Sequence, residues 1–118
     1  MKNFTITFPI DNEYFTTVRL TTGGICALAG FDVESAEDFK VCVTESLLIL
    51  QRNGFTEAAI SYTLAEPMLC EIVGKTRTGE KQPGVEDEIS FALLQALLGE
   101  VAFEKDADGD VVAVKFNA

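Results

Sequence analysis

The 118-residue chain contains no histidine. This absence excludes a Ser-His-Asp triad, a Cys-His dyad, histidine-ligated zinc and a phosphohistidine relay. Cysteine is also scarce. Cys26, Cys42 and Cys70 are an odd number, have no Cys-x-x-Cys spacing and lie among apolar residues. We therefore expect buried, reduced thiols in a cytosolic protein.

Basic residues are few, since nine lysines and arginines stand against 19 acidic residues and give a formal net charge of −10. Such a charge repels nucleic acid and anionic membranes, and it favours either a basic protein partner or simply solubility. The chain has no apolar run of the roughly 20 residues that a bilayer-spanning helix needs. Its N-terminus alternates polar and apolar residues and lacks the apolar core of a signal peptide. We expect a cytoplasmic protein with no nucleic-acid or membrane partner.

The remaining composition is typical of a globular protein, with 47% hydrophobic and 24% charged residues. A chain of this length can build a hydrophobic core without disulfide or metal cross-links. We find no internal repeat and no low-complexity segment. The sequence therefore predicts one domain over residues 1–118.

The first third of the chain predicts a strand and two helices. A strand with Phe4, Ile6 and Phe8 on one face stops at Pro9. A helix over residues 12–30 follows the N-cap Asp11, and Gly30 ends it. Its apolar stripe is Phe15, Val18, Ile25 and Leu28. Gly23 and Gly24 in its middle each cost about 1 kcal/mol relative to alanine, which predicts a kink or a closely packed backbone.

A second helix is predicted from a capping-box-like start at Ser35-Ala36-Glu37-Asp38 to about Asn53-Gly54. Its core stripe is Phe39, Cys42, Val43, Leu47 and Leu50, and a second, partly apolar face holds Val41, Glu45, Ile49 and Arg52.

The rest of the chain predicts two hairpins around a third helix. The expected elements are strands at 58–65 and 68–76 joined by Glu66-Pro67, a loop at 77–85, a helix at 89–98 ended by Gly99, and strands at 101–105 and 111–116. The order β-α-α-β-β-α-β-β predicts the α+β class, a two-layer sandwich whose helices cover one face of a mixed, mainly antiparallel sheet.

Residues 37–45, Glu-Asp-Phe-Lys-Val-Cys-Val-Thr-Glu, resemble the helix that carries the catalytic carboxylate in anti-sigma-factor serine kinases. These proteins are small members of the histidine-kinase-like ATPase superfamily. The run Val18-Arg19-Leu20-Thr21 supports the resemblance, because the family often has a similar arginine-containing run in its first helix. The resemblance implies a Bergerat-type ATPase fold, whose element order matches the predicted one. It also places Glu45 at the position of the general base.

The resemblance further implies a magnesium-holding asparagine four residues after the glutamate, but Ile49 stands there. A hydrocarbon side chain cannot coordinate a cation that requires oxygen ligands. In the family an Asp-x-Gly-x-Gly box binds the adenine amino group, and here Lys75, Arg77 and Gly79 occupy its three positions. Lysine has donors only, so it cannot replace the aspartate.

The phosphate-binding parts implied by the resemblance are also missing. A Gly-x-Gly-Leu turn should present backbone amides, but the matching stretch is Glu88-Ile89-Ser90-Phe91, directly after Glu86 and Asp87. The nucleotide lid is shortened, because only about a dozen residues separate Gly74 from Glu86. We therefore expect no cofactor; ATP and magnesium enter only if the chain is an active kinase.

Three sets of residues have both a functional and a structural interpretation. Glu45 is either a vestigial general base or an ordinary polar residue on a half-exposed helix face. Arg19, Gly23 and Gly24 are candidate partner-binding residues, although Arg19 can also be a solvated side chain on the polar side of an amphipathic helix. Residues 106–110, Asp-Ala-Asp-Gly-Asp, have the wrong glycine spacing for a calcium loop and predict a hairpin turn with Gly109 in a left-handed conformation.

These observations predict a bacterial, cytoplasmic regulator of transcription that resembles an anti-sigma factor and binds a protein partner, without ATP binding or kinase activity. The resemblance implies a sigma factor or an anti-sigma-factor antagonist as partner, and a homodimer formed near the first helix. Two alternatives stay open: an active serine/threonine protein kinase with an atypical ATP site, and an accessory dimerisation domain unrelated to transcription.

Overall fold

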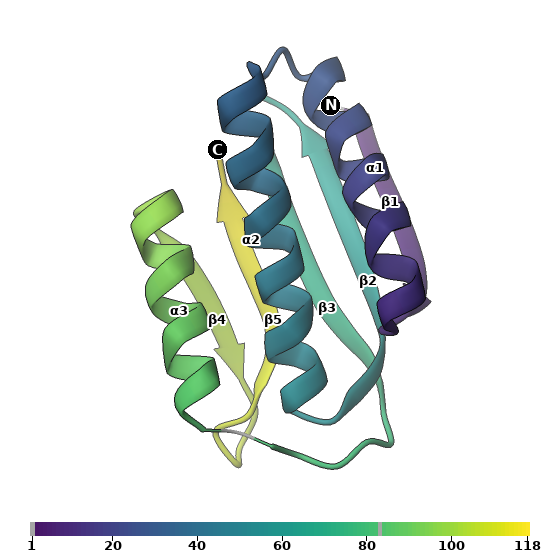
Figure 1. The fold of residues 1–118 in the computed structure, drawn as a ribbon, viewed down its shortest axis with the longest axis vertical. Coiled ribbons are helices and arrows are strands. Elements are labelled where there is room, and N and C mark those ends of the chain that lie inside the picture. Colours follow the sequence, from purple (N-terminus) through teal and green to yellow (C-terminus); the bar gives the residue numbers. More distant parts are fainter. Residues whose placement is uncertain (1, 83) are drawn as a thin grey trace.

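The computed structural model describes residues 2–82 and 84–118, which form one five-stranded sheet and three helices (Figure 1). The elements are β1 (Lys2–Pro9), α1 (Asn12–Leu28), α2 (Val33–Arg52), β2 (Phe55–Leu64), β3 (Leu69–Arg77), α3 (Val85–Leu98), β4 (Val101–Lys105) and β5 (Val111–Asn117). Their sequence confirms the predicted order β-α-α-β-β-α-β-β. The strand order across the sheet is β1-β2-β3-β5-β4, and every neighbouring pair is antiparallel.

The three helices lie on one face of the sheet, with α2 between α1 and α3 (Figure 1). This arrangement confirms the predicted two-layer α+β class. The core lies between α2 and the central strands, and the predicted stripe of α2 is buried in it. Its largest fully buried members include Phe39, Leu47, Leu50, Ile60, Tyr62 and Ile72. Within the described residues, no helix combines the length and the apolar character needed to cross a membrane.

The N-cap of α2 lies three residues before the predicted one. The helix begins at Val33, and its N-cap is Asp32, whose Oδ1 accepts a hydrogen bond from Ser35 N at 2.8 Å. Ser35 is therefore inside the first turn. The prediction at Ser35 was wrong because Asp32 is also a strong N-cap residue and has the extended backbone that the cap requires.

α1 confirms its predicted N-cap, because Asp11 accepts a hydrogen bond from Glu13 N. Leu28, predicted in the apolar stripe, is instead 76% exposed, since it lies in the last turn beyond the core. The two central glycines are not explained by a close backbone approach. A Cβ on Gly24 would meet nothing within 4 Å, and one on Gly23 would meet only the Lys40 side chain, at 3.4 Å.

α3 begins at Val85, four residues before the predicted start. Its first turn contains Glu86, Asp87 and Glu88, whose negative charges favour the positive end of a helix dipole. The sequence prediction placed a loop at 77–85 and began the helix at Ile89, so it left these three residues unassigned. As a result, α3 is longer than predicted and its polar first turn lies beside α2 (Figure 1).

Candidate functional site

A polar network joins α2 to α3 at the position of Glu45. Ser90 Oγ of α3 lies 3.1 Å from Glu45 Oε2 and donates its hydrogen to that carboxylate. Arg52, two turns further along α2, donates from Nη1 to Ser90 Oγ at 2.9 Å and to Asp87 Oδ1 at 3.0 Å. The Glu45 carboxylate is thus linked through a serine hydroxyl to a guanidinium of its own helix. We call Glu45, Arg52, Asn53, Asp87 and Ser90 the α2–α3 network.

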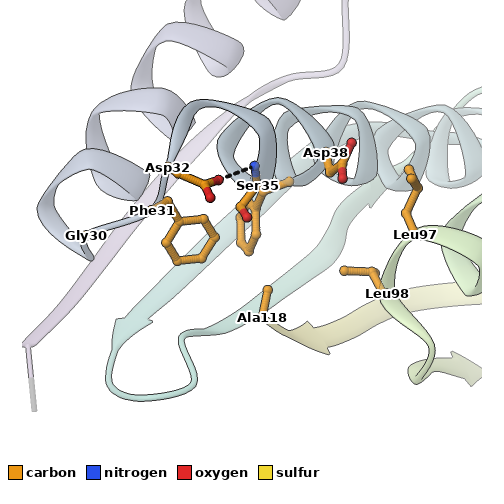
Figure 2. Close-up of a pocket in the computed structure, with 9 residues that line it drawn as sticks. Gly30, Phe31, Asp32, Ser35, Asp38, Leu97, Leu98 and Ala118 are labelled. Carbon is orange, nitrogen blue, oxygen red and sulfur yellow. Dashed lines mark hydrogen bonds between the residues drawn. The ribbon is translucent and has the colours of Figure 1, made fainter.

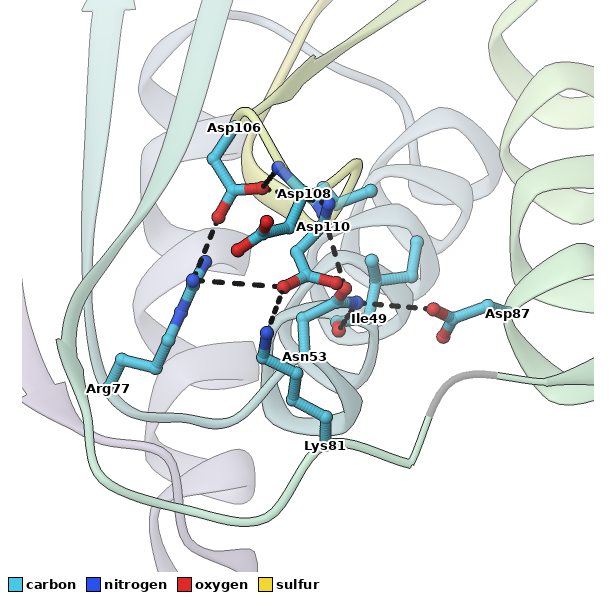
Figure 3. Close-up of polar contacts among 9 residues, drawn as sticks. Ile49, Asn53, Arg77, Lys81, Asp87, Asp106, Asp108 and Asp110 are labelled. Atoms are coloured by element: carbon cyan, nitrogen blue, oxygen red, sulfur yellow. Dashed lines mark hydrogen bonds and ion pairs between the residues drawn. The ribbon is translucent and has the colours of Figure 1, made fainter.

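Asn53 extends this network into the sheet (Figure 3). It is only 3% exposed, and its Nδ2 donates to Asp87 Oδ2 at 3.1 Å and to Ile49 O at 2.7 Å. Its Oδ1 accepts the backbone N–H of Val111 in β5 at 3.2 Å. Asn53 therefore fixes the end of α2 to α3 and to β5 at once. A buried polar network whose members are all paired favours a single packing arrangement.

Ile49 has no exposed surface and belongs to the hydrophobic core. It borders the α2–α3 network through Asn53, whose side-chain nitrogen donates hydrogen bonds to the Ile49 carbonyl and to Asp87 (Figure 3). The partly apolar face of α2 is thus only partly covered: Ile49 is buried, whereas Val41 on the same face is 40% exposed. No oxygen ligand is available at the Ile49 side chain.

The segment after β3 folds back onto the turn between α2 and β2. Gly79 N donates to Gly54 O at 2.9 Å, and Gln82 N donates to Arg52 O. The Arg77 guanidinium lies 4.4 Å from the centre of the Phe55 ring, a distance typical of a cation–π contact. Lys75, the residue at the adenine-binding position of the resemblance, is exposed at the end of β3. The segment after β3 is therefore held against the end of α2 by backbone hydrogen bonds.

Residues 88–91, which match the phosphate-binding turn, are in α3. The backbone amides of Ile89, Ser90 and Phe91 come after the first turn of a helix that begins at Val85, and such amides bond to carbonyls four residues earlier. The acidic first turn leaves Glu88 exposed and Asp87 buried against Arg52 and Asn53. This geometry offers no free row of amides at residues 89–91.

The turn between β4 and β5 brings three aspartates together (Figure 3). Asp106 Oδ1 accepts the backbone N–H groups of Asp108 and Asp110, each at 3.0 Å, and Gly109 has a φ of 85°. This confirms the predicted hairpin turn with a left-handed glycine. The carboxylates of Asp106, Asp108 and Asp110 lie within 4.8 Å of one another, as metal ligands would.

Two cations, Arg77 and Lys81, pair with two of the three carboxylates of this turn. Arg77 Nη1 lies 2.8 Å from Asp106 Oδ2, and Lys81 Nζ pairs with Asp110 Oδ2. The bond from Arg77 keeps the pKa of Asp106 below its ordinary value, and the bond to Asp110 raises the pKa of Lys81. The turn is thus stabilised by ion pairs within the chain.

The candidate partner-binding residues lie on α1, whereas the α2–α3 network lies on the side of α2 that faces α3 (Figure 1). Arg19 is exposed, and its Nη2 lies 3.4 Å from Thr16 Oγ1 of the same helix. Gly23 and Gly24 are one turn further along α1. Sequence reasoning therefore indicated two separate regions, and the structure does not bring them together.

The sequence reasoning missed most members of the α2–α3 network. Arg52 was assigned to the face of Glu45, but Asn53, Asp87 and Ser90 were not connected with it. A signal was available in the spacing: Asp87 and Ser90 are three residues apart and share one face of a helix. That face could be recognised only if α3 began before residue 87.

All three cysteines are buried and free, as predicted. Burial raises the pKa of Cys26 to about 11 and that of Cys42 to about 12, and it raises the pKa of Cys70 as well. A thiol must ionise to act as a nucleophile, so burial disfavours the reactive form of these thiols.

Comparison with known proteins relates the chain to one group of kinases. No protein-family model matches the chain. It is similar to the serine-protein kinase RsbW of Listeria monocytogenes serotype 4a and to that of Listeria innocua serovar 6a, with 31% identity over 70 residues in each case. The match includes 55% of this chain but only 45% of each relative, so the chain spans less than half the length of the curated relatives it matches. The similarity supports a distant relation of this chain to the anti-sigma-factor serine kinases.

Proposed function

We propose that the chain is a regulatory protein-binding module of the anti-sigma-factor type that binds no nucleotide. One observation carries the proposal: Ile49, at the position where the resemblance requires a magnesium-holding asparagine, is a fully buried core residue. Magnesium in nucleotide sites is held by carboxylate, carbonyl and phosphate oxygens and by water. A buried isoleucine offers none of these ligands and leaves no space for a hydrated ion.

The surroundings of Ile49 support the same proposal. The Glu45 carboxylate is bonded to Ser90, and the Asn53 amide is bonded to Asp87 and to Val111 N. A nucleotide between α2 and α3 would have to break these contacts. It would also approach the three acidic residues in the first turn of α3, which repel a triphosphate. We therefore interpret Glu45 as a vestigial general base whose carboxylate now accepts the hydrogen bond from Ser90.

α1 is the surface that we assign to the protein partner. The first 31 residues contain two basic residues, Lys2 and Arg19, and two acidic residues, Asp11 and Glu13. The whole net charge of −10 therefore lies in residues 32–118. A sigma factor, an antagonist or a second copy of the chain can approach α1 with less electrostatic repulsion than elsewhere. The exposed Arg19 and the side-chain-free surface at Gly24 are the contacts proposed there.

Melting curves with and without magnesium and ATP test the proposal. A ligand at 100 times its dissociation constant adds about 2.7 kcal/mol to the free energy of unfolding. For a domain of this size, that addition raises the melting temperature by more than about 8 °C. We expect no shift at millimolar Mg-ATP. A reproducible rise in melting temperature that disappears without magnesium would contradict the proposal that the chain binds no nucleotide.

An active kinase is the second candidate, because Glu45 is retained and is only half-buried. It is tested by transfer of labelled phosphate from ATP to a candidate antagonist protein. Transfer that Glu45→Gln reduces by about 10²–10⁴-fold would show that Glu45 is a working base.

Capture of partners from the native cell extract, followed by mass spectrometry, separates both candidates from an accessory dimerisation domain. Arg19→Glu should weaken the capture of a true α1 partner.

A further inference from the structure

A groove lies at the end of the molecule where α1 turns into α2. It consists of two cavities of about 360 Å³ and 630 Å³, and Gly30, Phe31 and Ala118 line both of them. We call this the α1–α2 end groove. It is separate from the α2–α3 network and from the exposed Arg19 on α1, and none of the functions considered above uses it.

The smaller cavity has an apolar lining that includes Phe31, Leu97 and Leu98 (Figure 2). Phe31 packs edge-on against Phe39 with 5.6 Å between ring centres, and Phe39 packs in turn against Phe116 of β5. Leu97 and Leu98, in the last turn of α3, form the opposite wall (Figure 2). The lining thus combines residues of α2 and α3 with Gly30, Phe31 and Asp32 of the connection between α1 and α2.

The rim of the groove is acidic. Asp32 and Asp38 line the smaller cavity and Glu66 lines the larger one, while no lysine or arginine of the described residues lines either cavity. The N-terminus of α2 would ordinarily attract an anion, but the Asp32 carboxylate already occupies it as the N-cap. The bond from Ser35 also lowers the pKa of Asp32, so this carboxylate is charged at neutral pH. A bound group should therefore be apolar in its centre and positively charged at its flanks.

We propose that the α1–α2 end groove binds a short segment of a protein partner in which an apolar anchor side chain is flanked by lysine or arginine. A volume of about 360 Å³ accommodates one large aliphatic or aromatic side chain. Asp32 and Asp38 then face the flanking cations, which gives the segment its orientation. The inference is independent of the proposed function, because it requires neither a sigma factor nor contact with Arg19, Gly23 or Gly24 of α1.

Titration of the ¹⁵N-labelled protein with short synthetic peptides tests the groove. The probe is acetyl-Gly-Lys-Phe-Lys-Gly-amide, and its controls replace the phenylalanine by alanine or both lysines by glutamate. We expect the probe to shift the amide signals of residues 30–39 and 97–98 in a saturable manner. The alanine peptide should bind at least about tenfold more weakly, and the glutamate peptide should not bind. Equal shifts from the probe and the alanine peptide would reveal mere attraction of cations to an acidic protein and would overturn the proposal.

Two matched variants locate the site. Asp38→Asn removes a rim charge and should weaken probe binding by about twofold to fivefold. Glu34→Gln removes the same charge from the same helix outside the groove and should leave the affinity unchanged. Ser35→Leu fills the smaller cavity while the backbone bond from Ser35 N to Asp32 remains, and it should abolish the saturable shifts. The proposal fails if Glu34→Gln and Asp38→Asn have equal effects, or if Ser35→Leu binds normally while its melting temperature shows a folded protein.

Discussion

Ser90 donates its hydroxyl hydrogen to Glu45 across the interface between α3 and α2, with 3.1 Å between the two oxygens. The serine belongs to the stretch that the sequence resemblance matches to a phosphate-binding turn, and the glutamate stands at the position of the catalytic base. In this chain the two residues contact each other. The interaction stabilises the packing of α3 on α2, and it predicts different roles for the members of the α2–α3 network.

Asp87→Ala should be the most destabilising change in the network. Asp87 is 9% exposed in its side chain and accepts hydrogen bonds from both Arg52 and Asn53. Its removal takes away the only anion that pairs with Arg52 among the described residues, which leaves the guanidinium with Ser90. It also leaves the buried Asn53 amide nitrogen with the Ile49 carbonyl. We expect a loss of about 2–4 kcal/mol in the free energy of unfolding. Urea denaturation followed by circular dichroism measures it.

Glu45→Gln is the matched control for that experiment. Glutamine keeps an oxygen that accepts the hydrogen bond from Ser90, so the loss should stay below about 1 kcal/mol. Equal losses for the two variants would contradict the assignment of Asp87 as the centre of the network.

Gly74→Ala should destabilise the sheet because a Cβ at this position of β3 would overlap the ring of Phe55. The ring cannot move freely, since Phe55 is buried and Arg77 lies over it. We expect a loss of about 1–3 kcal/mol, measured by urea denaturation. Gly24→Ala is the contrasting variant: its Cβ meets nothing within 4 Å, and alanine should stabilise helix α1 by about 1 kcal/mol. A gain of stability at Gly74 would show that the ring is not fixed there.

The element order and the core of α2 could be predicted from the sequence because they follow local periodicity. Phe39 and Leu47 recur at helical spacing, and both are buried. The start of α3 was misjudged because the acidic residues before Ile89 are equally typical of a loop and of a helical first turn. The contact of Glu45 with Ser90 could not be predicted, since the two residues are 45 positions apart and meet only through the packing of two helices.

Self-association through α1 is the third prediction. We expect a dimer in light scattering at micromolar concentration, because the first 31 residues carry no net charge and Gly24 presents no side chain to a partner. Gly24→Phe should convert the dimer to a monomer. Val33→Phe is the control, since it adds a similar ring at an 81% exposed position of α2. A monomer at high concentration would remove the proposal, as would a dimer that Gly24→Phe leaves intact.

The buried thiols predict a loss of stability at alkaline pH. Burial raises the pKa of Cys26 to about 11 and that of Cys42 to about 12, against 9.0 for an unperturbed thiol. The folded chain therefore keeps thiol protons that the unfolded chain loses above about pH 9, and each lost proton favours unfolding. The contribution of the thiols to the free energy of unfolding is complete below pH 9 and decreases as the pH rises toward 11 and 12.

Urea denaturation in the presence of a reducing agent at pH 8, 9 and 10 should show constant stability at first and then a decrease. Cys26→Ala, compared with the unmodified chain over the same pH range, should show a smaller decrease, because one of the thiols responsible is absent. A free energy of unfolding that stays constant to pH 10 would contradict the burial of these thiols in solution.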